Sequence, residues 1–140
     1  MISSQTGFLS LIRTENQRHA NGVKLTPVQV EELQIEVRLF VEAKDVGQSA
    51  DILIVAYHKT PTKTTTYMRV DENWTAWNGK IAHLEPTTQY EHLPERMEIS
   101  IFEGDLSELS GKFTVYSGYR LETEQSIIFN GDSPIEFSID

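Results

Sequence analysis

The stretch Leu33-Gln-Ile35-Glu-Val37-Arg-Leu39-Phe-Val41-Glu42 decides the fold, because five aliphatic residues alternate in it with mostly polar ones. Successive side chains of a β-strand point to opposite faces of a sheet, so this period of two predicts a strand with one buried face and one solvated face. Such strands are typical of antiparallel sheets that cover a core on one side. The buried face therefore needs a second layer to pack against.

The sequence on the C-terminal side of this stretch continues the β pattern. Turn residues at 45–49 precede Ile52-Leu-Ile-Val-Ala-Tyr57, a continuous apolar run that predicts a central strand, which we expect to pair with the strand at 33–42. Further strands are expected at residues 64–70, 97–101 and 113–121. Residues 85–95 contain two prolines and show almost no periodicity, which indicates a connection that crosses from one sheet to the other.

Turn signals predict two hairpins. Asn78-Gly79 is the dipeptide that best fits a two-residue hairpin turn, and it should join short strands at 74–77 and 81–84. Residues 130–134 should likewise join strands at 126–129 and 135–139. The one candidate for a helix is the segment 26–32, where Thr26 could cap and Pro27 could take the first helical position of one or two turns.

Together these segments give about eight strands, which predicts an all-β chain folded as a two-sheet antiparallel β-sandwich. We expect residues 1–30 to form an extended N-terminal arm and linker and residues 31–140 to form the sandwich domain. The inward positions of the expected strands predict the following core residues: Val37, Ile54, Ile99, Val115 and Phe137.

Composition narrows the classes of function. A chain of 140 residues with 39% apolar and 24% charged residues fits one globular domain, and no apolar run approaches the roughly 18 residues of a membrane-spanning helix. The net charge of −9 argues against a nucleic-acid partner, which needs a basic face. The charge is uneven, because residues 1–30 carry +2 and residues 31–140 therefore carry −11. There is no cysteine, which removes disulfides and zinc-thiolate sites.

Two parts of the sequence resemble a known kind of domain. Gly111-Lys-Phe-Thr-Val-Tyr116-Ser-Gly118-Tyr119-Arg-Leu, followed by Ile127-Ile-Phe-Asn130-Gly-Asp-Ser-Pro134-Ile-Glu-Phe137, resembles the closing strands of immunoglobulin-like domains of bacterial surface and exported proteins. The segment 45–55 is similar to the turn and central strand of the same modules. The resemblance covers about a third of the chain, and it implies an immunoglobulin-like sandwich located outside the cell or at its surface. The cysteine and tryptophan spacing of antibody domains is absent.

No pattern in the sequence predicts catalysis, a metal site or a cofactor. His19, His58, His83 and His92 never fall at metal-ligand spacing. The acidic pairs lie where turns or strand edges are expected, which favours solvated carboxylates over general acid and base groups. Nucleophile-elbow, P-loop and dinucleotide-binding motifs are absent. We therefore expect a non-catalytic protein with no metal and no cofactor.

The N-terminal segment is the first candidate interaction site. Gly7-Phe-Leu-Ser-Leu-Ile12 is strand-like and belongs to the only net positive part of the chain. It could fold back as an edge strand of its own domain, or it could add to the sheet edge of a neighbouring copy or a flanking domain. The second arrangement would make a self-assembling or surface-displayed structural module. Its candidate assembly residues are Phe8, Leu9, Leu11, Ile12, Arg13 and Arg18.

Aromatic residues give the second candidate site, a ligand face. Aromatic rings on a sandwich face are a common means of holding sugars, and the candidates are Tyr67, Trp74, Trp77 and Tyr90. Trp74 and Trp77 are three residues apart, so in a strand they should face opposite sides, which favours ordinary core packing for at least one of them. A carbohydrate-binding or other ligand-binding module is thus the alternative to an interaction module. The compartment expected is extracellular or cell-surface, with the cytoplasm left open.

Overall fold

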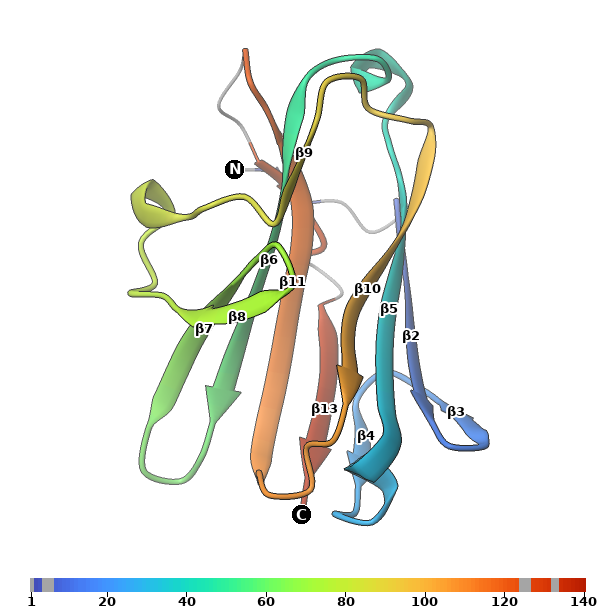
Figure 1. Cartoon of the computed structure of the whole chain (residues 1–140), viewed down its shortest axis with the longest axis vertical. Coiled ribbons are helices and arrows are strands. Elements are labelled where there is room, and N and C mark those ends of the chain that lie inside the picture. Colours follow the sequence, from blue (N-terminus) through green and yellow to red (C-terminus); the bar gives the residue numbers. More distant parts are fainter. Residues whose placement is uncertain (1, 4–6, 124–126, 132–133) are drawn as a thin grey trace.

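The computed structural model describes residues 2–3, 7–123, 127–131 and 134–140, and within them the chain forms two β-sheets that pack face to face (Figure 1). The predicted all-β, two-sheet fold is confirmed. Eight of the described strands have four residues or more, and five others, β1, β3, β4, β9 and β12, have two or three. In the same residues, no helix is long and apolar enough to cross a bilayer.

The larger sheet, called sheet A here, is built around two long strands. β6 (Ala50–Lys59) and β11 (Gly111–Leu121) pair in antiparallel fashion along ten positions of each strand. The other strands flank this pair in the order β1-β12-β11-β6-β7-β8. Their bounds are β1 (Ile2–Ser3), β7 (Thr64–Val70), β8 (Asn73–Ala76) and β12 (Ile127–Phe129). β13 (Ile135–Ile139) pairs with β11 and with β4 (Val23–Leu25), and β9 (Thr88–Tyr90) pairs with β6.

The smaller sheet, called sheet B, has four strands in the order β10-β5-β2-β3. Its centre is β5 (Leu33–Phe40), the alternating stretch, flanked by β10 (Arg96–Gly104) and β2 (Phe8–Thr14). β2 continues through a tight turn into β3 (Gln17–His19). The burial of β5 alternates strictly over its first seven residues, with Leu33, Ile35, Val37 and Leu39 buried. The burial of the side chains of β5 therefore alternates as its sequence predicts.

The core lies between the two sheets and comes from their inward rows. Val37 of sheet B packs in one cluster with Ile54, Val115 and Phe137 of sheet A, and all four are buried as predicted. Ile99 on β10 is only half-buried, although it packs against this cluster and against a second one around Leu39, Ile52 and Tyr119. Burying these rows at about 25 cal/mol per Å² of apolar surface is the main force that orders the chain.

The first 30 residues contribute strands to both sheets. β1 pairs in parallel with β12, β2 and β3 lie in sheet B, and β4 pairs in parallel with β13 in sheet A. The predicted helix at 26–32 is the single 3₁₀ turn Gln29–Glu32. Thr26 and Gln29 close that turn with reciprocal bonds, since the hydroxyl of Thr26 accepts from the N–H of Gln29 and the side-chain oxygen of Gln29 accepts from the N–H of Thr26.

Three pairing predictions are wrong. β5 and β6 do not pair, because the turn between them carries the chain from sheet B to sheet A. The hairpin at Asn78-Gly79 does not form, because β8 pairs with β7 and Ile81–His83 is a 3₁₀ turn. β12 and β13 do not form a hairpin either, since both run antiparallel to β11 along the same edge. Ser126, Asp132 and Ser133 of that predicted hairpin lie outside the described residues.

Residues 85–95 form the predicted connection between the sheets. The segment adds the unpredicted strand β9 to sheet A before it reaches β10 in sheet B. Two bonds hold it against sheet A, because Thr87 donates its N–H to the carbonyl of Ile52 at 2.7 Å and its hydroxyl to the carbonyl of Arg69 at 2.6 Å. The connection is therefore hydrogen-bonded to sheet A before it reaches sheet B.

Candidate functional site

The candidate assembly residues lie on the β2–β3 hairpin, which pairs with β5 of the same chain. This is the first of the two arrangements that the sequence left open. Ile12 is fully buried, and Phe8 is half-buried against both core clusters. The others belong to the outer face of sheet B, where Leu9 is 56% exposed and Arg13 stands opposite Arg18.

The outer edge of β2 is covered over only part of its length. β3 pairs with residues 12–14 of β2 and reaches no further. On the inner edge, the N–H of Phe40 donates to the carbonyl oxygen of Gly7 at 2.6 Å. Backbone groups alternate between the two edges of an antiparallel strand, so Leu9 and Leu11 face β5 while Phe8 and Ser10 direct their N–H and C=O outward. Within the described part of the chain, nothing pairs with these groups; we call residues 7–11 the open window.

The opposite edge of sheet B, along β10, is blocked at Ser100 and Ile101. The guanidinium of Arg69 on β7 donates through Nη1 to the carbonyl oxygens of Ser100 and Ile101, the second at 2.9 Å. A β-bulge between Ser100 and Phe102 disturbs the ladder at the same place. Burial lowers the pKa of Arg69, and the charge of Glu72 raises it. Charge, a bulge and occupied carbonyls are the usual means by which a sheet edge is kept from pairing with another chain.

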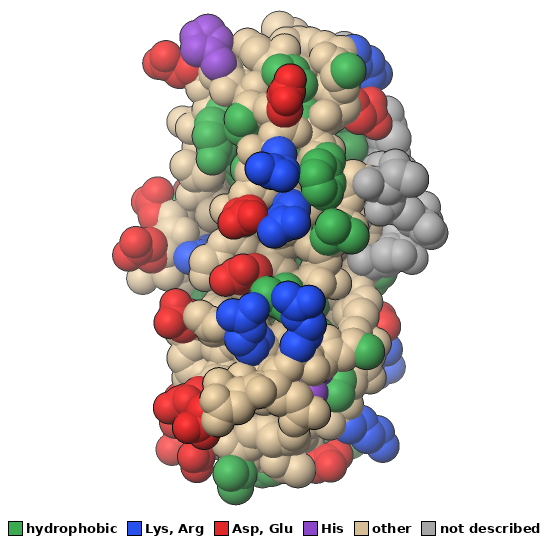
Figure 2. All heavy atoms as spheres, turned by 90° about the vertical axis from the view of Figure 1, so that its right-hand side faces the viewer, with side chains coloured by type: hydrophobic (Ala, Val, Ile, Leu, Met, Phe, Trp, Pro, Cys, Tyr) green, Lys and Arg blue, Asp and Glu red, His purple; other side chains and the backbone are tan. Residues whose placement is uncertain are grey.

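The outer face of sheet B is charged along its middle and aliphatic beside the open window. Figure 2 looks at this side of the molecule, where acidic and basic side chains alternate down the face next to hydrophobic ones. Arg38 of β5 and Glu98 of β10 form an ion pair at 2.9 Å. Leu9 and Leu11 border a shallow hollow that also includes Arg18 and Glu36. Leu9 and Leu11 of β2 thus lie beside a face that carries both acidic and basic side chains.

The four candidate aromatic residues do not form one face. Tyr67 and Trp74 line a cavity of about 260 Å³ between the sheets. Trp77 lies on the opposite side of sheet A, as the three-residue spacing predicted, and it is only 8% exposed, with its indole N–H bonded to the carbonyl of Lys80 at 2.9 Å. Tyr90 packs against the second core cluster.

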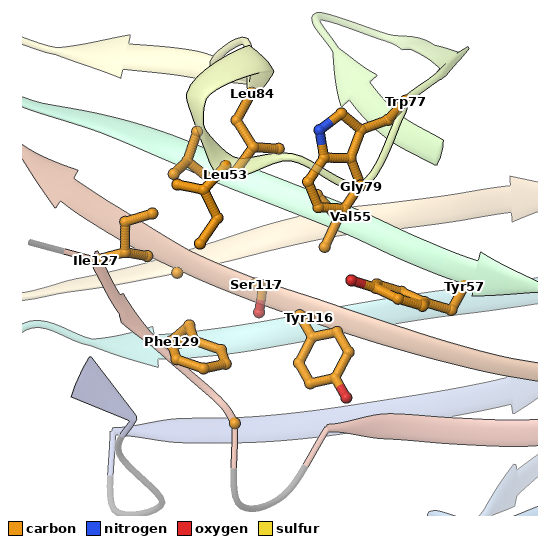
Figure 3. Close-up of a pocket in the computed structure, with 13 residues that line it drawn as sticks. Leu53, Val55, Tyr57, Trp77, Gly79, Leu84, Tyr116, Ser117, Ile127 and Phe129 are labelled. Carbon is orange, nitrogen blue, oxygen red and sulfur yellow. The ribbon is translucent and has the colours of Figure 1, made fainter. Parts of the chain in front are cut away.

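A cleft of about 410 Å³ on the outer face of sheet A is lined by Trp77, one of the four candidate aromatic residues, and by three rings outside that set, Tyr57, Tyr116 and Phe129. Figure 3 shows Trp77 and Leu84 on one side and Tyr116 and Phe129 on the other. Tyr57 stands edge-on to both Trp77 and Tyr116, with ring centroids 6.2 and 5.6 Å apart. Burial raises the pKa of the Tyr57 hydroxyl, and the neighbouring Tyr116 raises it further. The sequence gives no signal for this grouping, because residues 52–57 are a continuous apolar run and Tyr57 meets Tyr116 only through the pairing of β6 with β11.

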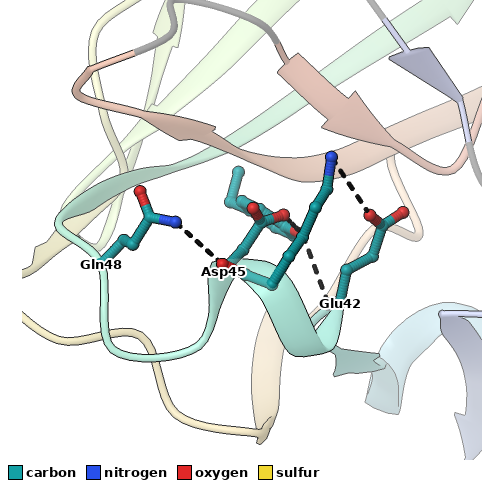
Figure 4. A network of polar contacts seen from close by, with 5 residues as sticks. Glu42, Asp45 and Gln48 are labelled. Atoms are coloured by element: carbon teal, nitrogen blue, oxygen red, sulfur yellow. Dashed lines mark hydrogen bonds and ion pairs between the residues drawn. The ribbon is translucent and has the colours of Figure 1, made fainter.

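A buried polar contact anchors the turn that crosses between the sheets. Figure 4 shows the local contacts of this turn, in which Asp45 donates its N–H to the carbonyl of Glu42 and Gln48 donates its side-chain amide to the carbonyl of Lys44. The carboxylate of Asp45, whose residue is 1% exposed, accepts the hydroxyl hydrogen of Tyr119 at 2.7 Å. Burial and the bond to Asp45 raise the pKa of Tyr119. The arrangement holds the turn to β11.

The histidines serve local contacts. His83 Nδ1 lies within hydrogen-bond distance of the side-chain amide of Asn78, and His92 Nδ1 lies 3.2 Å from the carbonyl of Gly47. His58 stacks on Phe113, with ring centroids 4.3 Å apart. Across the described ranges, no three His, Asp or Glu side chains gather in a way that could hold a metal ion.

No protein-family model matches the sequence, and no curated protein matches it.

Proposed function

We propose that this chain is a non-catalytic interaction module of the immunoglobulin-like type. The strand order supports the type, because sheet A runs β12/β13-β11-β6-β7-β8 and sheet B runs β10-β5-β2. In variable-type immunoglobulin domains the orders are G-F-C-C′-C″ and D-E-B-A, so β10, β5 and β2 correspond to E, B and A, and no described strand of sheet B corresponds to D. The parallel pairing of β4 with β13 supports it further, since it places an N-terminal strand beside the last one. The proposed location, outside the cell or at its surface, comes from the resemblance to modules of exported proteins.

The module acts by accepting an extended strand at the open window of β2. The observation that carries this proposal is the contrast between the two edges of sheet B, since β10 is blocked by Arg69 and a bulge while residues 7–11 present unpaired backbone groups and the exposed Leu9. An added strand gains main-chain hydrogen bonds from such an edge, and side-chain contacts then select the partner. The partner is a protein.

Binding of a synthetic peptide tests strand addition. The peptide should contain residues 7–14 of the chain, which have the length and sequence of β2, and binding should be followed by amide chemical shifts of β2. We expect the shifts to be largest at Phe8 and Ser10. Ser10→Pro should abolish binding, because proline lacks the outward N–H and its ring obstructs the edge, whereas Ser10→Ala keeps the N–H and should bind as the natural chain does.

Equal binding by these two variants, with equal melting temperatures, would contradict the proposal. Shifts confined to sheet A would contradict it as well, because the peptide would then occupy another surface.

A second candidate function rests on the cleft of sheet A. Four aromatic rings line a concavity of about 410 Å³, a size within the range of small-molecule sites. Its lining is mostly hydrocarbon, with hydroxyls from Tyr57, Tyr116 and Ser117, so it favours a ligand with an apolar or aromatic surface over a carbohydrate, which needs many hydrogen-bond partners.

Tryptophan fluorescence can test the cleft, because Trp74→Phe leaves Trp77 as the single tryptophan of the chain. Anilinonaphthalene sulfonate bound in the cleft should quench Trp77, and Tyr116→Ala should weaken the quenching while Tyr90→Ala should not. Soluble oligosaccharides serve as the second probe. Quenching by them in place of the dye would favour the carbohydrate alternative, and quenching by neither would remove this candidate.

A further inference from the structure

The unpaired backbone groups of the open window are arranged symmetrically about one residue, and this symmetry determines which partner strand fits the window best. Residues 7–11 are free on the outer edge, with β3 beginning to cover the strand at Ile12. Leu9 is the middle residue of this window. Because the outward backbone groups belong to Phe8 and Ser10, they are placed symmetrically on either side of Leu9.

We propose that the strand accepted at this edge is β2 of a second copy of the same chain, related by a two-fold axis through Leu9. This inference rests on the proposed function of strand addition and names its partner. In an antiparallel pair centred on Leu9, Phe8 stands opposite Ser10 of the second copy, and Ser10 stands opposite its Phe8. Both positions direct N–H and C=O at each other, so each pair exchanges both of its hydrogen bonds. A two-fold interface requires this reciprocity, in which residue i meets residue j and j meets i.

Other registers of the same two strands fit less well. Shifting the register by one residue would place outward-facing groups opposite inward-facing ones, so the ladder would not form. Shifting the register by two residues toward β3, which moves the axis to Ser10, would set Phe8 opposite Ile12 of the second copy, whose outer edge is already paired with His19. The window therefore favours the register that is centred on Leu9.

The side chains of the window agree with this pairing. Leu9 is 56% exposed on the outer face, and in the proposed register it meets Leu9 of the second copy at a non-hydrogen-bonded position, where facing side chains come closest. Residues 7–11 carry no charge, although the whole chain carries −9. Pairing thus sets no like charges opposite each other within the window.

The net charge predicts how the dimer should respond to salt. Two chains of −9 repel each other at long range, and added salt screens this repulsion, whereas the uncharged window has no ion pair to lose. Association should therefore strengthen from about 20 mM to about 200 mM salt, a change over which the Debye length falls from roughly 20 Å to below 10 Å.

Disulfide trapping gives the decisive test, because the chain has no cysteine of its own. Leu9→Cys should place the new thiol opposite the same thiol of the second chain. Mild oxidation should therefore cross-link it at least about tenfold faster than a thiol outside the interface, because the effective concentration of the two thiols is high in the dimer. Val28→Cys is the matched control, because Val28 is 74% exposed and lies far from the window in sequence. Adding Ser10→Pro to Leu9→Cys should bring its rate down to that of the control.

Sedimentation velocity of the unmodified full chain completes the test, and a dimer that strengthens with salt is expected. Equal cross-linking of Leu9→Cys and Val28→Cys, or a monomer at all concentrations, would overturn the two-fold pair. If the chain is a monomer but the peptide of residues 7–14 still binds at β2, strand addition stands and the second copy is the wrong partner. If neither associates, the proposed function fails together with this inference.

Discussion

Replacing Tyr119 by phenylalanine should lower the free energy of unfolding by about 1.5–3 kcal/mol, the range for a hydrogen bond that involves a charged group. The ring is 1% exposed and would stay in the second core cluster, so the change removes only the hydroxyl. That hydroxyl donates to the carboxylate of Asp45 at 2.7 Å and lies 3.5 Å from the N–H of Glu42. Its loss leaves the buried carboxylate of Asp45 without this donor, which places the expected cost in the upper part of the range.

Urea denaturation followed by circular dichroism measures this loss. The midpoint should fall with no change in slope, because the surface exposed on unfolding is the same. Tyr90→Phe is the matched control, since Tyr90 packs against the same cluster and its hydroxyl makes no hydrogen bond to the described residues. That variant should change stability by less than about 0.5 kcal/mol.

A double-mutant cycle with Asp45→Ala then isolates the pair. The two changes should be less costly together than the sum of the single changes, with an interaction energy of about 1–3 kcal/mol. If Tyr119→Phe costs no more than the control, or if the two changes are additive, the contact between Tyr119 and Asp45 does not anchor the crossing turn.

Four other expectations follow from the same structure. Ile101→Ala should cost about 3–5 kcal/mol in a denaturant melt, and Ile99→Ala about 2, because Ile101 is 1% exposed whereas Ile99 is half-buried; equal losses would contradict this placement. Gly118→Ala should cost at least about 1–3 kcal/mol, since a Cβ there would overlap the backbone of β12, and an unchanged melting temperature would show that β12 lies elsewhere. Arg69→Met should speed hydrogen exchange at the amides of β10 and lower stability by about 1.5–3 kcal/mol, and unchanged exchange would remove the guanidinium as the block on that edge. The raised pKa of Tyr119 means that the folded state disfavours its phenolate, so the contribution of Tyr119 to stability should be constant below about pH 10 and fall as the pH rises above it; Tyr119→Phe, compared across urea midpoints at about pH 8 and pH 11, should lose part of this dependence.

Strands and their buried faces could be predicted because burial leaves a local pattern. The apolar residues of β5 alternate in the sequence as their burial alternates in the structure. Trp74 and Trp77 lie on opposite sides of sheet A because successive side chains of an extended chain point to opposite faces. The long strand β11 and the last strand β13 follow the same rule. In each of these elements the side chains that decide the structure lie within a few residues of one another.

The partners of the strands could not be predicted, because long-range contacts decide them. The turn after β5 has ordinary turn residues, yet Asp45 within it is bonded to Tyr119, which lies in β11 at the far end of the chain. Asn130 belongs to a typical hairpin sequence, but its N–H and side-chain oxygen bond to the two backbone groups of Ser117 and fill the gap between β12 and β13. Asn78 does make a turn, with its side chain accepting from the N–H of Lys80, although no second strand follows it.

The candidate sites divide in the same way. The strand-like pattern of residues 7–12 predicted β2 from local sequence, so the strand that carries most of the candidate assembly residues could be predicted. The cleft could not be, because Tyr57 and Tyr116 meet only through the pairing of β6 with β11, in the register that sets Tyr57 opposite Thr114 and Val55 opposite Tyr116. A site formed by residues of two paired strands cannot be predicted until the register of the pairing is known.

The two edges of sheet B give the strongest reason to regard β2 as functional. An unprotected sheet edge exposes a soluble protein to uncontrolled association, and natural sequences usually block such edges. This chain blocks β10 with a guanidinium, a bulge and charged residues, and it covers the C-terminal end of β2 with β3. Residues 7–11 have none of these devices and place Leu9 outward instead. If the window served no partner, a single charged residue at that position would protect it at little cost to the fold, so its aliphatic character favours an edge that is meant to be occupied.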